Sequence, residues 1–441
     1  AADIDTSLDF GSGANGPILT FDKQTDNKLL VGGDFSQFAG IVSNNIDRLL
    51  VTGAVDLADF DPGSGTNDWV RSVIALPDGK ILAAGDFTTF NNANVNYLVR
   101  LNANGSIDNT FNQSPGANDW IRSMSRQSDG KIIIGGDFTT YNGITSNYID
   151  RINADGTLDL STFNPGDGAN NFVYTTALQT DGRILIGGIF TAYDNVTRNG
   201  IARLNTDGSL DTGFNPGTGV NAAIYSISIQ ADGKIIIAGD FSTYNGVSRS
   251  GVARLNADGS LDTGFNPGTG ATASVYTSTL QSDGKIILGG LFAFFNGLSR
   301  NGIVRLNTNG SVDTSFDPQG GFDDYVHFVR WENDMVWATG AFTSYRGTPR
   351  GGIVRIFAPA EVPLTAEPAA QATNLNFTNV TSTSLTVNFT AAAPAADGYI
   401  AIRRAGAAPT TDPADGTAYT VGTSLGDGTI AFVGSATSFE Q

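Results

Sequence analysis

The chain has 441 residues, and its 43 acidic and 25 basic side chains give a formal net charge of −18. Nucleic acids and anionic membrane surfaces are bound by clustered Lys and Arg, so this charge argues against both as partners. The chain contains no Cys, which excludes disulfides, zinc–thiolate sites and thiol nucleophiles, and no apolar run approaches the roughly 20 residues that span a bilayer.

The chain begins with AADIDTSLDF and has no initiating Met. Small residues at a new N-terminus are typical of a cleaved signal peptide, so we expect an exported protein. The segment IDTSLDFGSG at 4–13 also matches LDTGFNPGTG at 210–219. This match indicates an internal repeat.

Three markers recur with a common spacing of about 51 residues. The Phe of GGDF-like motifs gives Phe35, Phe87, Phe138, Phe190, Phe241, Phe292 and Phe342. The Arg of RLN-like segments gives Arg48, Arg100, Arg151, Arg203, Arg254, Arg305 and Arg355. The Asp of SLDTGF-like segments gives Asp5, Asp56, Asp108, Asp159, Asp211, Asp262 and Asp313. The sequence therefore contains seven copies of one unit, and we expect each Arg to bond an Asp or a backbone carbonyl.

Each unit is expected to contain four short antiparallel strands. In the fifth, 224–230, 234–244, 250–256 and 260–265 are rich in β-branched or aromatic residues, and Asp-Gly turns separate the first pair and the last pair. Helical periodicity is absent. Repeated four-stranded units are typical of a β-propeller. The first copy begins with a fourth-strand segment and the last copy stops after its third strand, so we expect the N-terminal strand to complete the last blade and close a seven-bladed ring.

The GGDF-like motif invites comparison with a phosphate loop or a metal site. Gly-Gly within a strand is typical of close backbone approach, whereas a phosphate loop needs a helix start after it. Residues Ile189, Leu291 and Ala341 replace the Asp in three copies. We therefore interpret Gly135-Gly136 and its counterparts as packing positions against the neighbouring blade.

The run DGKIIIGGDFTTYNG, together with RINADGTLDLSTFN, resembles the delta-60 type β-propeller repeat of large exported bacterial proteins. The resemblance covers residues 1–357. It implies the propeller fold and says little of function, because propellers host many unrelated functions.

After the propeller, 358–371 is rich in Pro and Ala and is expected to be a linker. Residues 372–441 contain alternating strand patterns that resemble a fibronectin type III-like, Ig-like β-sandwich of Bacteroidota surface proteins. Only about five of the seven strands that such a domain needs fit here, so it is expected to be truncated. The resemblance implies export by the type IX secretion system.

The loops that enter the first strands of blades two and three read NDWVRS and NDWIRS. Indole rings beside carboxylate and guanidinium groups suit stacking on a sugar and hydrogen bonding to its hydroxyls. The alternative is that both Trp side chains fill the central seam. The candidate binding residues are Trp69, Trp120, Asp68, Asp119, Arg71, Arg122, Tyr325 and His327.

Other charged groups have simpler interpretations. Arg198, Arg249, Arg300 and Arg350 make one half of the ring locally basic; we expect them to balance the acidic chain rather than bind an acidic polysaccharide. His327 is the only His, so a Ser-His-Asp site has one possible place. A glycosidase pair could come from Asp68, Asp119, Asp323 or Asp324. No catalytic residue, metal or cofactor is assigned.

We therefore expect a non-enzymatic adhesion protein, located outside the cell or on the outer membrane exterior. Its partners would be an extracellular glycan or surface protein, and the secretion machinery during export, with gliding motility as an extension of this expectation. The alternatives are a carbohydrate-active hydrolase that uses carboxylates of the loop face, and a passive spacer of a large exported protein.

Overall fold

The computed structural model describes residues 2–112 and 115–359, followed by the shorter segments 373–378, 386–390, 399–403, 421, 424–425, 428–434 and 438–440. All regular elements in these residues are β-strands, and none is a helix, so the prediction of an all-β chain is confirmed. The chain divides into two compact units, Ala1–Ala360 and Glu361–Gln441, which are described separately.

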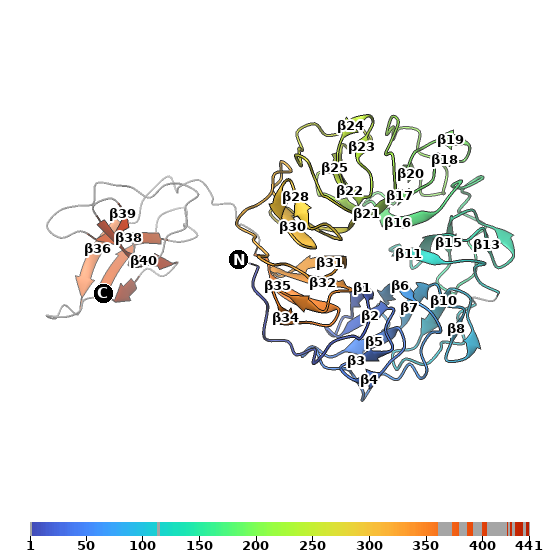
Figure 1. The fold of residues 1–441 in the computed structure, drawn as a ribbon, viewed down its shortest axis with the longest axis horizontal. Coiled ribbons are helices and arrows are strands. Elements are labelled where there is room, and N and C mark those ends of the chain that lie inside the picture. Colours follow the sequence, from blue (N-terminus) through green and yellow to red (C-terminus); the bar gives the residue numbers. More distant parts are fainter. Residues whose placement is uncertain are drawn as a thin grey trace. The chain divides into compact units, whose positions relative to one another are not determined.

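The first unit contains seven antiparallel sheets of three strands, which stand around a common centre in Figure 1. We number these blades 1 to 7 in chain order. Their strands are β1 (Ile18–Lys23), β2 (Leu29–Gly33) and β5 (Ile46–Leu49); β6 (Val70–Ala75), β7 (Ile81–Gly85) and β10 (Leu98–Leu101); β11 (Ile121–Arg126), β12 (Ile132–Gly136) and β15 (Ile149–Ile152); β16 (Val173–Leu178), β17 (Ile184–Gly188) and β20 (Ile201–Leu204); β21 (Ile224–Ile229), β22 (Ile235–Gly239) and β25 (Val252–Leu255); β26 (Val275–Leu280), β27 (Ile286–Gly290) and β30 (Ile303–Leu306); β31 (Val326–Glu332), β32 (Met335–Gly340) and β35 (Ile353–Phe357).

The predicted turn chemistry explains each sheet. In blade 5, Gly233 has a φ of +83°, which suits Gly because it has no Cβ to clash, and the turn joins β21 to β22. The middle strand β22 is buried along its whole length, as its apolar sequence IIIAG predicts. The first strand of each blade lies innermost in Figure 1, where β6, β11, β16 and β21 face the centre.

Two details of the predicted blade were wrong. The fourth segment is not a full strand: in blade 5 it makes one bridge, Leu255 to Leu261, before Asp262 accepts the backbone N–H of Gly264 and turns the chain. In addition, a short hairpin, whose two strands have two residues each, lies between the second and third strands of each blade and was not expected. These hairpins are β3 (Gln37–Phe38) with β4 (Ile41–Val42), β8 (Thr89–Phe90) with β9 (Ala93–Asn94), β13 (Thr140–Tyr141) with β14 (Ile144–Thr145), β18 (Ala192–Tyr193) with β19 (Val196–Thr197), β23 (Thr243–Tyr244) with β24 (Val247–Ser248), β28 (Phe294–Phe295) with β29 (Leu298–Ser299) and β33 (Ser344–Tyr345) with β34 (Thr348–Pro349).

The Gly-Gly pairs have the packing role expected of them. A Cβ on Gly135 would lie 2.8 Å from Val173 Cγ1 of the next blade. A Cβ on Gly136 would lie 2.1 Å from the carbonyl oxygen of Trp120. Neighbouring blades therefore approach each other, and their own entry loops, more closely than larger residues would allow.

The repeated Arg and Asp residues form the predicted pairs. In blade 3, Arg151 Nε donates to Asp159 Oδ2 at 2.9 Å, and its Nη1 donates to the carbonyl oxygen of Thr206 in the next blade at 2.8 Å. Lys131 donates to the same carboxylate at 2.8 Å. The equivalent pairs are Arg48–Asp56, Arg100–Asp108, Arg203–Asp211, Arg254–Asp262, Arg305–Asp313 and Arg355–Asp5.

The N-terminal segment lies against the last blade. Ile4 makes an antiparallel bridge with Ile356, and Tyr345 Oη donates to the carbonyl oxygen of Ala2 at 2.7 Å. Within single repeats, Tyr141, Tyr193 and Tyr244 make the same kind of bond to Gly156, Gly208 and Gly259.

The second unit has two antiparallel sheets in its described residues. One contains β36 (Thr373–Thr378), β37 (Thr386–Thr390) and β41 (Ser438–Glu440), and the other contains β38 (Tyr399–Arg403), β39 (Ser424–Leu425) and β40 (Gly428–Gly434). The expected linker 358–371 lies almost entirely outside the described residues, as does most of the fibronectin-like run 403–427.

Candidate binding site at the inner mouth

The candidate Trp residues lie where each entry loop becomes the innermost strand of its blade. Asp68 Oδ1 accepts the N–H of Trp69, and Asp119 Oδ1 accepts that of Trp120, both at 2.8 Å. Both indole rings are half-buried, and both carboxylates are exposed. We call the surrounding set of side chains the inner mouth: Trp69, Arg71, Trp120, Arg122, Phe172, Tyr174, Tyr225, Tyr276, Tyr325 and His327.

Guanidinium groups alternate with the indole rings along this set. The guanidinium carbon of Arg71 lies 4.9 Å from the centroid of Trp69 and 5.1 Å from that of Trp120. The corresponding carbon of Arg122 lies 5.0 Å from Trp120 and 4.8 Å from Tyr174. These distances are those of cation–π contacts, so blades 2, 3 and 4 are joined at the inner mouth by a continuous stack.

The Asp of the GGDF-like motif holds this stack in place. Arg71 Nε and Nη2 donate to Asp86 at 2.5 and 2.6 Å, and Arg122 makes two bonds of 2.6 Å to Asp137. Burial alone would lower the pKa of Arg122, but Asp137 raises it above its usual value. Bidentate pairs fix both guanidinium planes, so Trp120, which contacts both of them, is held in one orientation.

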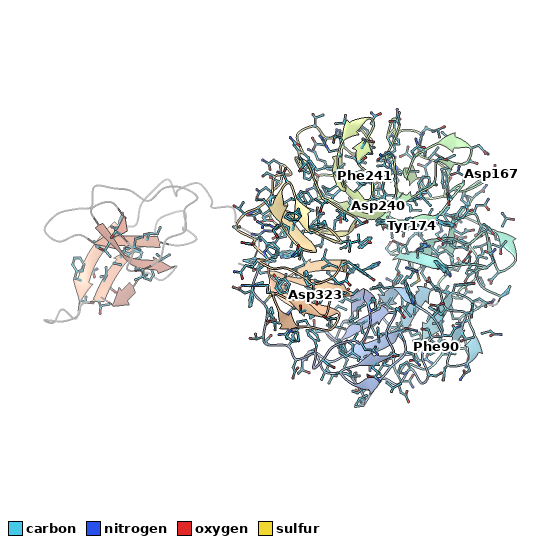
Figure 2. All side chains as sticks on the ribbon, in the orientation of Figure 1. Phe90, Asp167, Tyr174, Asp240, Phe241 and Asp323 are labelled. Carbon is cyan, nitrogen blue, oxygen red and sulfur yellow. The ribbon has the colours of Figure 1, made fainter. Side chains whose placement is uncertain are left out.

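The other side of the inner mouth is aromatic. Tyr174, Tyr225, Tyr276 and Tyr325 follow one another with centroid separations of 5.4, 5.5 and 5.7 Å. Tyr225 donates a hydrogen bond to Asp240 at 2.6 Å. Figure 2 shows that Tyr174 and Asp240 lie nearer the common centre of the seven blades than Phe90 and Asp167 do.

His327 completes this side. Its Nδ1 lies 2.8 Å from the carbonyl oxygen of Leu19, and its ring stacks on Tyr276 at 5.8 Å. Burial, and to a lesser extent the charge of Arg71, lowers the pKa of His327 to about 4. The imidazole is therefore neutral at physiological pH. The structure thus brings all eight candidate residues to the inner mouth or its edge.

Asp34 belongs to the same region and was missed. Burial raises its pKa, the charge of Asp68 raises it further, and a hydrogen bond from Trp69 opposes the rise. Within residues 2–112 and 115–359, no Lys or Arg forms an ion pair with Asp34, Asp68 or Asp119. Asp34 is the Asp of the GGDF-like motif in blade 1. In blades 2, 3 and 5 the innermost strand supplies this Asp with a hydrogen-bond donor, from Arg71, Arg122 and Tyr225. In blade 1, Leu19 occupies the position of Arg71 and supplies none.

Tyr97 and Tyr148 were also missed. Both have left-handed backbones, with φ of +72° and +67°, and both precede the third strand of their blade. Blades 4 to 7 place Gly there, as Gly200, Gly251, Gly302 and Gly352. Comparing the repeats position by position would have revealed this exchange.

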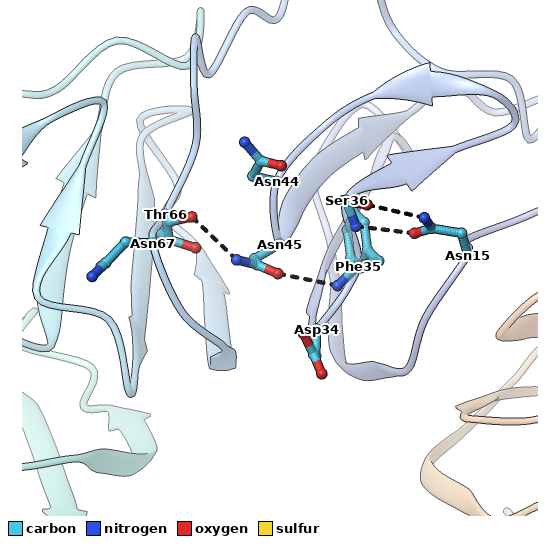
Figure 3. Close-up of a pocket in the computed structure, with 8 residues that line it drawn as sticks. All are labelled: Asn15, Asp34, Phe35, Ser36, Asn44, Asn45, Thr66 and Asn67. Carbon is cyan, nitrogen blue, oxygen red and sulfur yellow. Dashed lines mark hydrogen bonds between the residues drawn. The ribbon is translucent and has the colours of Figure 1, made fainter.

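A cleft of about 470 Å³ opens between blades 1 and 2 beside Asp34 (Figure 3). Its lining is almost wholly polar: Asn15, Asp34, Phe35, Ser36, Asn44, Asn45, Thr66 and Asn67. Asn45 crosses the cleft, accepting the N–H of Phe35 at 3.0 Å and donating to the carbonyl oxygen of Thr66 at 3.1 Å. Amides and one carboxylate are groups that hydrogen bond sugar hydroxyls.

A second cleft, of about 410 Å³, includes Asp323, Asp324 and Arg346 of blade 7. Asp323 is occupied structurally, because it accepts the hydroxyl of Thr343 at 2.6 Å and the N–H of Ser344 at 2.9 Å. Burial would raise its pKa, but these bonds lower it. Asp323 is therefore a poor candidate for a general acid.

The expectation that the four loop Arg residues balance the acidic chain holds only for Arg300, which lies 3.3 Å from Asp317. Arg198, Arg249 and Arg350 instead donate to the carbonyl oxygen of the preceding residue at 2.8 Å, and no carboxylate among the described residues pairs with them. Arg300 makes the same backbone bond to Ser299 at 2.7 Å, and the difference lies in the partner: Asn215 and Asn266 stand 17 residues after Arg198 and Arg249, where Asp317 follows Arg300.

Two negative findings concern the part of the chain that the structure describes. No group of three or more His, Cys, Asp or Glu side chains is arranged to hold a metal ion. No helix there is long and apolar enough to cross a membrane.

A model of the "Domain of unknown function (DUF5122) beta-propeller" matches residues 24–58, 76–111, 127–161, 179–214, 230–265 and 281–316. The chain carries DUF5122 β-propeller repeats. The predicted resemblance to delta-60 repeats is thereby confirmed across residues 24–316. No DUF5122 match extends beyond residue 316, so the fibronectin-like resemblance and export by the type IX system stay predictions.

No curated protein matches this chain. Among solved structures, the WD40 β-propeller domain of Doa1 is similar, with a TM-score of 0.53 and 14% identity over 81% of this chain and 97% of that one. Virginiamycin B lyase from Staphylococcus aureus gives a TM-score of 0.48 and 13% identity over 80% and 98%. The extracellular domain of a putative hybrid two component system from B. thetaiotaomicron gives 0.49 and 14% over 88% and 47%. At these identities the likeness is one of fold alone.

Proposed function

We propose that this protein is a non-enzymatic binding protein that contacts glycans with its inner mouth. The observation that carries the proposal is the Trp69–Arg71–Trp120–Arg122 stack, which is fixed by Asp86 and Asp137 at the edge of exposed carboxylates. A preorganised indole surface loses little entropy when a sugar ring stacks on it. Carboxylates and amides beside it can accept and donate hydrogen bonds to the sugar hydroxyls.

We further propose that the seven blades form a closed propeller. The bridge of Ile4 to Ile356, the Arg355–Asp5 pair and the bond from Tyr345 to Ala2 support this, because each repeats a contact made within the other units. Closure would remove the exposed edge of the last sheet. It would also hold the inner mouth at a fixed diameter.

A hydrolase is the second candidate. Asp34, whose pKa is raised by burial and by Asp68, could donate a proton while Asp68 acts as the ionised partner. The sequence had suggested Asp68, Asp119, Asp323 and Asp324 for this chemistry, and burial of Asp34, which raises its pKa, adds Asp34 as a candidate proton donor. A passive spacer is the third candidate and would need neither the aromatic stack nor the carboxylates.

The localisation follows from the resemblances rather than from the site. We propose a secreted or surface-exposed protein, exported by the type IX system, with a fibronectin type III-like sandwich in residues 372–441. Gliding motility is one setting for such an adhesin. Detection of the protein on intact cells, with and without a functional type IX system, would test this placement.

The binding proposal is tested by screening the whole chain against surface glycans and measuring both binding and release of reducing ends. The Trp69→Ala, Trp120→Ala double variant is expected to lose binding by at least roughly tenfold, or ~1.4 kcal/mol. Phe294→Ala is the control, because Phe294 is an exposed aromatic residue on blade 6. Unchanged binding in the double variant would refute this site. Turnover abolished by Asp34→Asn would favour the hydrolase instead.

A further inference from the structure

We infer that the inner mouth over blades 2 to 4 selects saccharides that carry protonated amino groups, and that Tyr97 and Tyr148 are its specificity residues. This inference rests on the proposed glycan binding and names the ligand class. It follows from where the aromatic rings and the unpaired carboxylates gather, and from the backbone conformation of the two Tyr residues.

Only blades 2 and 3 carry an aromatic residue at both of two repeated positions. The residue that precedes the innermost strand by one position is Trp69, Trp120, Phe172 and Tyr325 in blades 2, 3, 4 and 7, but Pro17, Ala223 and Ser274 in blades 1, 5 and 6. The residue before the third strand is Tyr97 and Tyr148 in blades 2 and 3, but Gly in blades 4 to 7. Architectural positions recur in every blade, so the coincidence of the two aromatic positions in blades 2 and 3 indicates a local role.

The two Tyr residues are held in an unfavourable backbone conformation. A bulky residue with a left-handed backbone is uncommon, and such strain persists only where the surrounding structure enforces it. In blade 4, a Cβ on Gly200 would lie 2.3 Å from Val220 Cγ2. The residues aligned with Val220 in blades 3 and 4 are the smaller Ala117 and Ala169, and they belong to the clusters against which Tyr97 and Tyr148 pack. The small side chains of Ala117 and Ala169 leave room for these rings, although Ala271 stands at the same position opposite Gly251.

Both rings reach the inner mouth. Tyr148 makes an edge contact with Phe172, with centroids 5.8 Å apart and planes inclined by 62°. The pKa of Tyr97 is raised by burial and then by the charges of Asp119, Asp86 and Asp68. The backbone agrees with this, because the carbonyl oxygen of Tyr97 accepts the N–H of Gly85, the neighbour of Asp86, at 3.1 Å.

The charge of this region is negative after all its ion pairs are counted. Five carboxylates, Asp34, Asp68, Asp86, Asp119 and Asp137, meet two guanidinium groups, Arg71 and Arg122, which leaves a formal charge of −3. Arg71 and Arg122 are engaged by Asp86 and Asp137. Asp34, Asp68 and Asp119 thus keep their capacity to bind a cation from the ligand.

Aromatic faces beside unpaired carboxylates attract organic cations. An amino sugar satisfies both, because its ring can stack on Trp69, at the end of the stack, while its ammonium group donates charge-assisted hydrogen bonds to a carboxylate. An N-acetylated sugar retains only the stacking. An acidic sugar is repelled. The expected order of affinity is therefore amino sugar, then N-acetylated or neutral sugar, then uronic acid.

The test compares β-1,4-linked glucosamine hexamers with N-acetylglucosamine hexamers by titration calorimetry with the whole chain. The pH is mildly acidic, so that the sugar amines are protonated. We expect the glucosamine hexamer to bind roughly tenfold more tightly, a ratio that falls as salt is added. The Asp68→Asn, Asp119→Asn variant should abolish this ratio and retain binding of the acetylated hexamer. Asp129→Asn is the control, since Asp129 occupies an Asp-Gly turn on the opposite face.

The Tyr97→Gly, Tyr148→Gly variant is expected to fold, because Gly occupies the same position in blades 4 to 7, and to weaken both hexamers while reducing their ratio. An unchanged ratio in a folded variant would overturn the role of the Tyr residues. Equal affinity for both hexamers would overturn the charge selectivity and leave glycan binding intact. No binding of any glycan would instead remove the proposed function itself. Binding of an oligolysine in place of both hexamers would also overturn the inference, in favour of a basic protein partner.

Discussion

At the scale of single residues, two buried carboxyl groups limit the stability of the first unit. Asp150 is 4% exposed; the hydroxyl of Ser146 donates to one of its carboxylate oxygens, and the backbone N–H of Arg151 donates to the other. Burial raises the pKa of Asp150 to about 6, and burial does the same for Asp47 in blade 1. Blades 4 and 5 place Ala202 and Ala253 at this position, so the acid is not needed to build a blade.

The Asp150→Asn variant should be more stable than the native protein at pH 8. The unfolded chain loses this proton near its ordinary pKa of about 4, and the folded chain only near 6, so stability falls as pH rises between those values and stays lower above them. Asn mimics the protonated acid, and we expect a gain of ~1–2 kcal/mol at pH 8. Chemical denaturation at pH 8 and pH 4 measures it.

The Asp232→Asn variant serves as the control. It removes a charge from an exposed turn and replaces Asp-Gly with Asn-Gly, which forms the same kind of turn. An equal gain for Asp150→Asn at both pH values would mean that ionisation is not the cause. A loss at pH 8 would mean that the carboxylate is ionised and well solvated in the folded protein.

At the scale of the strand, the two glycines of each motif are not equivalent. A Cβ on Gly136 meets a backbone carbonyl oxygen, which cannot move without displacing the Trp120 loop. A Cβ on Gly135 meets methyl groups of Val173 and Thr176, which can rotate. At the position of Gly135, blades 2 and 5 have Ala84 and Ala238. At the position of Gly136, all seven blades have Gly.

We therefore expect Gly136→Ala to lower the free energy of unfolding by ~3 kcal/mol or more and Gly135→Ala by ~1 kcal/mol. Thermal melts of the two variants provide the comparison. Only Gly136→Ala should also weaken ligand binding, because Asp137 N–H bonds the displaced Trp120 carbonyl at 2.8 Å. Similar melts for both variants would show that the entry loop yields as easily as a side chain.

Local signals at this scale explain what could be predicted from sequence. Repeat length, Asp-Gly turns and apolar middle strands act within a few residues, so the blades and the Arg–Asp pairs followed directly. The short hairpins were missed because a pair of two-residue strands has no period. The fourth strand was overestimated because Asp262 turns the chain after one bridge. Tyr97 and Tyr148 were missed because an aromatic residue gives no local sign of a left-handed backbone.

At the scale of the whole molecule, the decisive property is whether the ring is closed. Closure determines whether the inner mouth keeps one shape or opens between blades 7 and 1. The chain offers an internal standard for this question. Asp5 pairs with Arg355 across the chain ends, and Asp211 pairs with Arg203 within blade 4, and both carboxylates are nearly fully buried.

In a closed ring, Asp5→Ala and Asp211→Ala should have similar costs, because each removes the buried carboxylate partner of a repeated guanidinium, which is buried in Arg203 and partly buried in Arg355. We expect ~3 kcal/mol for either, measured by chemical denaturation in separate variants. If the ring is open in solution, residues 2–9 are frayed and Asp5→Ala should be silent while Asp211→Ala keeps its full cost. An open ring would also free the edge of β35 to pair with another copy, so that molecular mass would rise with concentration. Equal costs with a constant mass would leave closure as the physical basis of a rigid inner mouth.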